Sequence, residues 1–269
     1  YILENIKKYK IPSSTSSSKE IVFEAYKDGL KRLLLPSLKR EALTQLKEKA
    51  SSEAINLFGK NLKELLLTPP LVNQVILGMD PGYVSGCKLA VIDENGNYLA
   101  SNVIYPTKPK EDFVNSSKIV LELIKKYTIN SIAIGNGTAS QETAAFISKL
   151  INENNLDIKY AVVSEIGASV YSASKIAMLE YPNLDVTIRG AISIAQRLRD
   201  PMAALVKIDP KSLGIGQYQH DVNQKELEQK LENVTVDLVN KVGVDINSAS
   251  YKLLSFISGI SEKIALNII

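Results

Sequence analysis

The stretch VILGMDPGYVSGCKLAVID, residues 75–93, decides the fold of this chain. It consists of two apolar runs, with the segment Asp80-Pro81-Gly82 between them. Each run is rich in the apolar and β-branched residues of a buried strand, and the proline and glycine between them favour a turn. The stretch therefore predicts a β-hairpin that carries the carboxylate of Asp80 near its turn.

A carboxylate at the end of a first strand, followed by a glycine turn and a return strand, resembles the opening of two groups of proteins. In the ribonuclease-H-like nucleases the aspartate binds Mg²⁺, which polarises a phosphodiester and activates water. In the actin-like and sugar-kinase ATPases the glycine turn holds phosphates. An aspartate that only caps the turn is a third interpretation, and the hairpin alone leaves all three open.

The composition predicts a globular, cytoplasmic protein. Of the 269 residues 45% are hydrophobic, which is enough for one large domain or two to three small ones. No apolar run approaches the roughly 20 residues needed to cross a bilayer, and the N-terminus lacks a signal-peptide pattern. Because the chain does not begin with Met, we expect a fragment or a processed product.

One cysteine and one histidine exclude a zinc site. We interpret Cys87, inside the second apolar run, as a buried and inert thiol. His220 lies in a polar, glycine-rich loop, and no serine or cysteine partner for it can be identified. We therefore expect a hydrogen-bonded structural histidine and not a catalytic one.

The positive charge is concentrated in the N-terminal part. The formal net charge is only +3, but residues 1–70 hold 13 Lys and Arg against 8 Asp and Glu, whereas the remainder holds 19 against 21. A solvated helix face and a phosphate-binding surface both explain this surplus.

Apolar residues at helical spacing predict two helices in this N-terminal region. The segment 12–18 is a loop in which Ser17 or Ser18 caps a first helix that begins near Lys19 and ends at Pro36. A second, longer helix follows and ends before Thr68-Pro69-Pro70. We place a domain boundary there and expect domains at residues 1–70, 71–215 and 216–269.

From residue 75 the pattern changes to short apolar runs separated by turns. It predicts a meander of three antiparallel strands, followed by alternating helices and strands. The predicted strands are 75–79, 86–92, 98–105, 131–134 and 160–163, and the predicted helices are 111–127, 139–152, 172–180, 189–198 and one from Gln224 to Gly243. This order is that of the α/β ribonuclease-H-like (RNase H-like) fold.

Asn136 and Glu165 follow the fourth and fifth strands, so in that fold they lie at the same sheet edge as Asp80. The segment Gly135-Asn136-Gly137-Thr138 leads into a helix. A glycine-flanked turn at a helix N-terminus can bind an anion through its N–H groups, but it can equally be a tight connection in which Thr138 caps the helix.

Residues 253–265 have the pattern of a helix-hairpin-helix, a helix followed by a glycine turn and a second helix. The N–H groups at the start of the second helix suit a backbone phosphate, which predicts binding to nucleic acid through Gly259, Ile260, Ser261 and Lys263 without base readout. The alternative is a helical corner that only packs on its neighbour. Ser261 stands where a second glycine is usual in this motif.

Five runs, in one order and with the expected gaps, resemble the Tex family of bacterial transcription accessory proteins over nearly the whole chain. They are GMDPGYVSGCKLAVID, IAIGNGTASQET, VVSEIGASVYSAS, RGAISIAQRLRDPMAALVKIDPKSLGIGQYQHDVNQ and VGVDINSAS. The resemblance implies a helical N-terminal region, a YqgF domain of RNase H-like fold related to the RuvC-type resolvases, and a C-terminal helix-hairpin-helix region. It also implies RNA or DNA as partner, contact with RNA polymerase or the transcription machinery, and a fragment, because the family's RNA-binding β-barrel does not follow in this sequence.

The resemblance also allows the nuclease site to be compared residue by residue. Asp80 and Glu165 match acidic positions of the resolvases, but Asn136 stands where these enzymes have a glutamate, and no aspartate matches with certainty in the helix around Ala191. We therefore expect a nucleic-acid-binding accessory factor that needs no cofactor and whose Asp80 and Glu165 are vestiges of a catalytic site.

The alternative is a metal-dependent, structure-selective nuclease. It requires Mg²⁺ at Asp80 and convergence of Asp80 and Glu165 with Asp200 or Glu142. An actin-like ATPase is disfavoured, because no second phosphate-binding Asp-x-Gly turn follows in the sequence.

Overall fold

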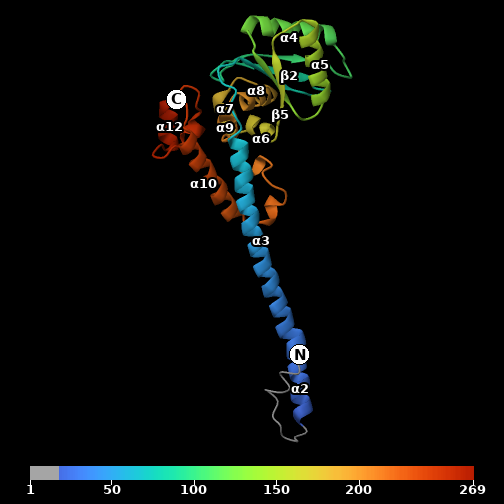
Figure 1. Ribbon diagram of the computed structural model, residues 1–269, viewed down its shortest axis with the longest axis vertical. Helices are drawn as coiled ribbons and strands as arrows, with labels where there is room; N and C mark the ends of the chain where they lie inside the picture. The colour runs from blue at the N-terminus through green and yellow to red at the C-terminus, as the bar shows by residue number, and fades with distance from the viewer. Residues whose placement is uncertain (1–17) are drawn as a thin grey trace. The chain divides into compact units, whose positions relative to one another are not determined.

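The computed structural model describes residues 18–269 (Figure 1). Contacts divide the chain into two compact units, with the division between Ala54 and Ile55. The three domains predicted from the sequence stay a prediction.

The first unit is helical, as expected, but the break predicted at Pro36 is wrong. Helix α2, Ser18–Gly29, continues through a π-helical segment, Leu30–Leu34, into helix α3, Leu35–Leu66. A proline clashes with the carbonyl four residues before it and lacks an N–H. The wider π turn, in which the Leu35 N–H bonds to the Leu30 oxygen, accommodates the proline without ending the helix.

Both ends of the predicted helical region can be compared with the structure. The predicted start near Lys19 agrees with a first described helical residue at Ser18, whereas Ser17 and the rest of the loop 12–17 lie outside the described residues. Helix α3 ends at Leu66, as Thr68-Pro69-Pro70 predicts, because two consecutive prolines cannot continue the hydrogen-bonded ladder.

The second unit is built on a five-stranded sheet of order β3-β2-β1-β4-β5. Strands β1, β2 and β3 form the predicted antiparallel meander, and β4 and β5 add in parallel beside β1. The strands are β1 Ile76–Asp80, β2 Cys87–Ile92, β3 Tyr98–Ile104, β4 Ser131–Gly135 and β5 Lys159–Val163. A mixed sheet in this order has the topology expected for the RNase H-like fold.

Helices cover both faces of this sheet (Figure 1). Helices α4, Phe113–Tyr127, and α5, Ser140–Glu153, pack on one face, and helix α8, Val186–Arg199, packs on the other. Gly78 in β1 permits the close approach of α8, because a Cβ there would overlap with the Ala191 carbonyl oxygen. This packing brings α8 against the end of β1 that carries Asp80.

The region after β5 contains more short helices than the sequence predicted. In place of one helix over 172–180 there are two, α6 Ala168–Ser172 and α7 Lys175–Glu180, because the Ser174 side chain caps a new helix start. The sequence analysis also missed α9, Pro201–Leu205, whose N-cap is Asp200. Proline at the first helical position fits the start of a helix and was a signal for it.

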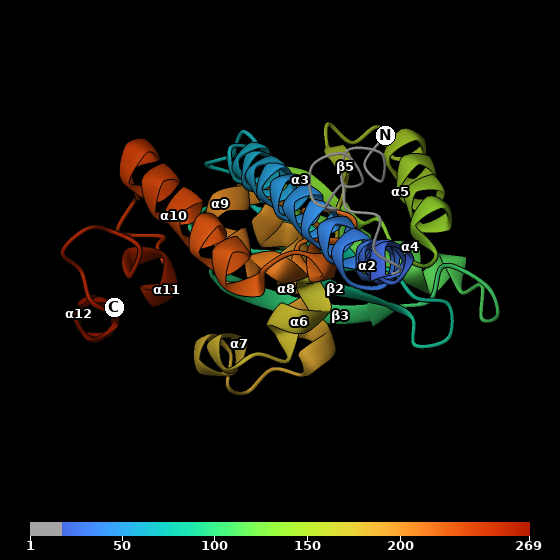
Figure 2. The same cartoon turned by 90° about the horizontal axis from the view of Figure 1, so that it is seen from below.

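The C-terminal part of this unit is helical (Figure 2). It consists of α10 Gln224–Val242, α11 Tyr251–Leu254 and α12 Glu262–Ile268. Gly216 lies so close to Phe58 of α3 that a Cβ would overlap with its ring, and Asn61 donates a hydrogen bond of 2.8 Å to the Ile215 carbonyl. Among residues 18–269, no helix is both long and apolar enough for a membrane span.

Candidate functional site

Asp80 ends β1 at the sheet edge where β4 and β5 also end. It is half-buried, and α8 crosses directly over it. A Cβ added at Gly190 of α8 would lie only 3.0 Å from Asp80 Oδ2. The helix therefore meets this carboxylate with a glycine and brings no acidic side chain to it at the point of closest approach.

Glu165 and Asn136 meet at the same edge. The Glu165 N–H donates a hydrogen bond of 3.0 Å to Asn136 Oδ1, and the Asn136 N–H donates one of 3.0 Å to the Val163 carbonyl. The structure thus brings together Asp80, Asn136 and Glu165, as their positions after parallel strands predicted. Asn136 thus braces the loop that carries Glu165 without adding a further negative charge beside the Glu165 carboxylate.

The turn at residues 135–138 differs from both interpretations of the sequence. The helix N-cap is Ala139, in the left-handed region with φ 61°, and Thr138 forms no capping bond, so the predicted cap is wrong. The Glu165 carboxylate lies directly on Gly137, where an added Cβ would overlap with it. The Glu165 carboxylate therefore places a negative charge at this turn, which disfavours an external anion there.

The electrostatics of the edge are set by two carboxylates and one amine. Burial, and secondarily the neighbouring Glu165 carboxylate, raise the pKa of Asp80 to about 6, while Lys88 opposes the shift. Lys88 is 8% exposed and donates to the Gly86 carbonyl at 3.0 Å and to Ser85 Oγ. The sequence analysis missed Lys88, although it is the register partner of Asp80 in the predicted hairpin.

The other carboxylates proposed for a nuclease site do not join this edge. Asp200 caps α9, and its carboxylate lies 3.9 Å from the Arg199 guanidinium. It follows Gly190 by ten residues, which is about 15 Å along the helix axis. Glu142 accepts a hydrogen bond of 2.7 Å from the Tyr83 hydroxyl. Across residues 18–269, no three His, Cys, Asp or Glu side chains are grouped to hold a metal ion. The donor set does not fit a two-metal site.

Arg197 is a buried charge that the sequence analysis did not identify. It lies on α8 and is 5% exposed. Its Nη1 donates a hydrogen bond of 2.6 Å to the Ser164 carbonyl, whereas Nε and Nη2 are buried and have no partner among the described residues. Burial lowers the pKa of Arg197 to about 10, although the Glu165 carboxylate acts in the opposite direction.

The structure confirms the prediction of a buried Cys87 but not the one made for His220. Cys87 is 1% exposed, as predicted, and burial raises the pKa of its thiol far above the usual range. His220 is exposed and forms no hydrogen bond among the described residues, so the expected structural contact is wrong. The neighbouring Gln219 has that role, because it is buried and donates to the Lys211 carbonyl at 2.5 Å.

The predicted helix-hairpin-helix turn lies between α11 and α12. Gly259 has φ 88°, and no atom of residues 18–269 lies within 4 Å of the position of a Cβ. Asn240 of α10 braces the turn, since its Oδ1 accepts from the Ser258 N–H at 2.9 Å and its Nδ2 donates to the Phe256 carbonyl at 2.9 Å. A rigid, open turn results.

The start of α12 leaves backbone donors unpaired. Ser261 is the N-cap, and its Oγ accepts from the Ile264 N–H at 3.3 Å. In the described part of the chain, the N–H groups of Glu262 and Lys263 have no partner, as expected for a first helical turn. Both residues are exposed, so these donors can reach a ligand.

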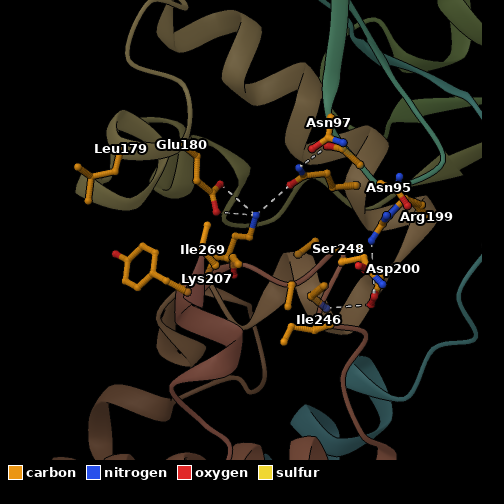
Figure 3. Close-up of a pocket in the computed structure, with 18 of the residues that line it drawn as sticks. Asn95, Asn97, Leu179, Glu180, Arg199, Asp200, Lys207, Ile246, Ser248 and Ile269 are labelled. Atoms are coloured by element: carbon orange, nitrogen blue, oxygen red, sulfur yellow. Dashed lines mark hydrogen bonds and ion pairs between the residues drawn. The ribbon is translucent and has the colours of Figure 1, made fainter. Parts of the chain in front are cut away.

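A cavity of about 620 Å³ separates the sheet-bearing region from the C-terminal helices (Figure 3). Several of its polar and charged side chains are already engaged in contacts within the protein. Lys207 lies 2.9 Å from the Glu180 carboxylate, Arg199 donates to the Glu94 carbonyl at 3.0 Å, and Gln196 donates to the Tyr181 hydroxyl at 2.9 Å. These contacts indicate a structural network.

Two families match parts of this chain. Residues 74–199 match the Tex protein YqgF-like domain, and residues 239–269 match the helix-hairpin-helix motif. Among solved structures, that of Thermus thermophilus RuvC aligns at a TM-score of 0.29 and 15% identity, covering 63% of this chain and 97% of that one.

Curated relatives extend the similarity to nearly the whole chain. The uncharacterized protein YdcI of Bacillus subtilis is 46% identical over 269 residues, all of this chain and 37% of YdcI. Protein tex of Bordetella pertussis is 49% identical over 88% of this chain and 30% of its own length. Human S1 RNA-binding domain-containing protein 1 is 44% identical over 93% of this chain and 25% of its own length. The chain thus spans about a third or less of these relatives.

The sheet topology, the two matching families and these identities agree. The chain belongs to the Tex family, with a YqgF-like domain of RNase H-like fold and a C-terminal helix-hairpin-helix motif.

Proposed function

We propose that this chain is a nucleic-acid-binding part of a Tex-like transcription accessory factor. The turn of the helix-hairpin-helix, residues 257–263, contacts backbone phosphates of RNA or DNA. The observation that carries the proposal is the open turn at Gly259 beside the unpaired N–H groups of Glu262 and Lys263.

The chemistry of this turn suits a phosphate. Unpaired N–H groups at a helix start point along the helix axis and carry partial positive charge. A side chain at position 259 would stand where a phosphate approaches, and the glycine leaves that space open. The exposed ammonium of Lys263 adds a full charge. Contacts of this kind position a nucleic acid without reading its sequence.

The proposal also includes a YqgF-like domain that binds no two-metal centre and does not cleave. Asp80 and Glu165 are the two carboxylates at the sheet edge, Asn136 is neutral and engaged with the Glu165 N–H, and α8 faces Asp80 with Gly190. Two divalent ions need more negative charge than this set supplies. We further propose the transcription machinery as partner, in line with the names of the relatives.

A metal-dependent nuclease is the second candidate, and one observation favours it. The Glu165 carboxylate lies close enough to Asp80 to raise its pKa, as a second ligand of a shared ion would. Incubation of labelled branched, duplex and single-stranded substrates with the chain and Mg²⁺ or Mn²⁺ decides this question. Cleavage that Asp80→Asn and Glu165→Gln both abolish would replace the first proposal for this domain.

The binding proposal is tested by a salt titration of duplex DNA and single-stranded RNA binding. We expect weak affinity, on the order of 10⁻⁴–10⁻⁶ M at physiological salt. Lys263→Ala should lower the magnitude of the salt slope by about one, equally for different sequences, whereas Lys118→Ala on α4 should leave it unchanged.

Gly259→Val should reduce binding by at least about tenfold, because the side chain blocks the phosphate. Gly243→Val is its matched control, since Gly243 also has positive φ, 85°, and open space around it but lies at the end of α10. Circular dichroism verifies that each variant is folded. If folded Gly259→Val and Lys263→Ala bind like the unchanged protein, the turn is a packing element.

A further inference from the structure

A groove of about 280 Å³ runs along the free edge of β5. Four consecutive residues of the chain at this strand, Ala161 to Ser164, line it. Because side chains alternate between the two faces of a strand, a cavity lined by consecutive residues lies beside the strand and not over one face. The opposite walls are the end of α3, the junction of α8 and α9, and Leu213.

Within residues 18–269, the backbone of β5 has hydrogen-bonding groups without a partner on this side. β5 is the last strand of the sheet, and β4 is its neighbour. The Val163 carbonyl accepts from Asn136 next to β4, so Val163 and Ala161 direct their polar groups toward β4. The direction alternates along a strand, so the N–H and C=O groups of Tyr160 and Val162 point to the free edge.

This edge lacks the features by which proteins usually prevent pairing with another chain. The sequence of β5 is KYAVV, with no proline, no bulge in its pairing with β4 and a single charge at its first residue. Tyr160 is 40% exposed and Val162 is 53% exposed. An exposed, apolar edge strand is a template for a further strand.

Arg197 adds a charge to this apolar groove. The residue lines the groove and is 5% exposed, with Nε and Nη2 unpartnered. A buried guanidinium with two of its three nitrogens unpartnered is unfavourable, so an acceptor at this end of the groove stabilises it. Most of the other lining residues are apolar, among them Val163, Leu205 and Leu213.

We propose that this groove binds an extended peptide segment of a partner protein, which adds a strand to β5 and places an acidic side chain against Arg197. Main-chain hydrogen bonds to Tyr160 and Val162 hold the segment, and its apolar side chains fill the groove. A carboxylate on an aliphatic stem fits the guanidinium and the apolar walls, whereas a phosphodiester would bring a strongly hydrated group into them. The proposal does not depend on nucleic-acid binding by the hairpin.

The probe is a library of random octapeptides displayed on phage and selected against the chain. We expect the enriched peptides to alternate β-branched residues around one Asp or Glu. The best peptide is then synthesised with that acidic residue and with its amide counterpart. The acidic form should bind at least about tenfold more tightly, the typical effect of a charged hydrogen bond to a buried partner.

Hydrogen exchange locates the bound peptide. The amides of Tyr160 and Val162 should become protected on binding, while those of Ala161 and Val163, which already face β4, serve as internal controls. Val162→Pro removes an outward N–H without touching the ladder with β4 and should abolish binding, whereas Val162→Thr retains the N–H and should bind within about twofold. Arg197→Met should make the acidic and amide peptides bind equally.

Several outcomes would overturn the proposal. They are a library without binders, enrichment without an acidic position, protection that spares Tyr160 and Val162, or equal binding by Val162→Pro and Val162→Thr. Displacement of the peptide by millimolar hexanoate alone would assign the groove to small carboxylic acids. Since Val162 is exposed, its variants test the site even if Arg197→Met fails to fold.

Discussion

The sheet edge at Asp80 and the turn at Gly259 both resemble places where proteins meet phosphates, yet they differ in what they leave free. At the sheet edge Asn136 is bonded to Glu165, the glycine turn is covered by a carboxylate, and α8 closes over Asp80. At the hairpin the donors of the first turn of α12 are exposed and unpaired. A phosphate needs free donors, and negative charge repels it, so the comparison favours the hairpin as the binding surface.

The largest expected effect comes from breaking the packing that closes the sheet edge. Gly78→Ala would drive a methyl group into the Ala191 carbonyl and should lower the free energy of unfolding by at least about 3 kcal/mol. Urea denaturation measures the loss. The control is Ala100→Gly in β3, an exchange of the same size away from α8, which should cost about 1 kcal/mol. Equal losses would mean that α8 tolerates a side chain at Gly78.

The second effect is a dependence of stability on pH. The pKa of Asp80 is raised to about 6 in the folded state, above its ordinary value in the unfolded state, so the folded protein binds more protons between these values. The contribution of Asp80 to the free energy of unfolding is therefore fully present below about pH 4 and is lost as the pH rises through about 6. The loss is on the order of 2 kcal/mol.

Asp80→Asn should remove this dependence and stabilise the protein at pH 7 relative to its parent. Denaturation at pH 4 and at pH 7 compares the two proteins. The opposite result, a parent that is more stable at pH 7 than at pH 4 and a variant without this difference, would show that the charged form of Asp80 has a favourable partner.

A smaller effect is expected at Gly137. Gly137→Ala should push the Glu165 carboxylate away at a cost of roughly 1 to 2 kcal/mol, since the end of a flexible side chain can move. Departure of this negative charge should lower the pKa of Asp80, which carbon NMR of the carboxyl group measures. Glu165→Gln removes the charge without displacement and should lower the pKa in the same direction. An unchanged pKa in both variants would leave burial as its sole cause.

The smallest expected effect is on the nucleic-acid affinity of a variant at Asp80, and it tests whether the sheet edge or the hairpin turn binds. Asp80→Asn should change nucleic-acid affinity by no more than about twofold, because a lone carboxylate repels a phosphate unless it holds a metal ion. The assay is the same salt titration that is applied to Lys263→Ala. A larger gain or loss, or one that appears only with Mg²⁺, would move the binding surface to the sheet edge.

The sequence predicted the positions of the strands and the meeting of Asp80, Asn136 and Glu165, because the ends of parallel strands share a sheet edge. It could not predict that the Glu165 carboxylate would cover Gly137, since that contact depends on a side-chain rotamer. Proline usually ends a helix, so Pro36 predicts a break. The π-helical segment before it accommodates the proline, and the helix continues.

The sequence by itself determined the order of the strands, the family and the hairpin turn at Gly259, because periodicity, glycine and capping residues act over a few positions along the chain. Only the tertiary structure decided that Gly190 faces Asp80, that Arg197 is buried with two unpartnered nitrogens, and that β5 leaves an apolar edge beside it. These facts depend on which residues of distant segments pack together, and burial arises from the whole fold and not from local pattern.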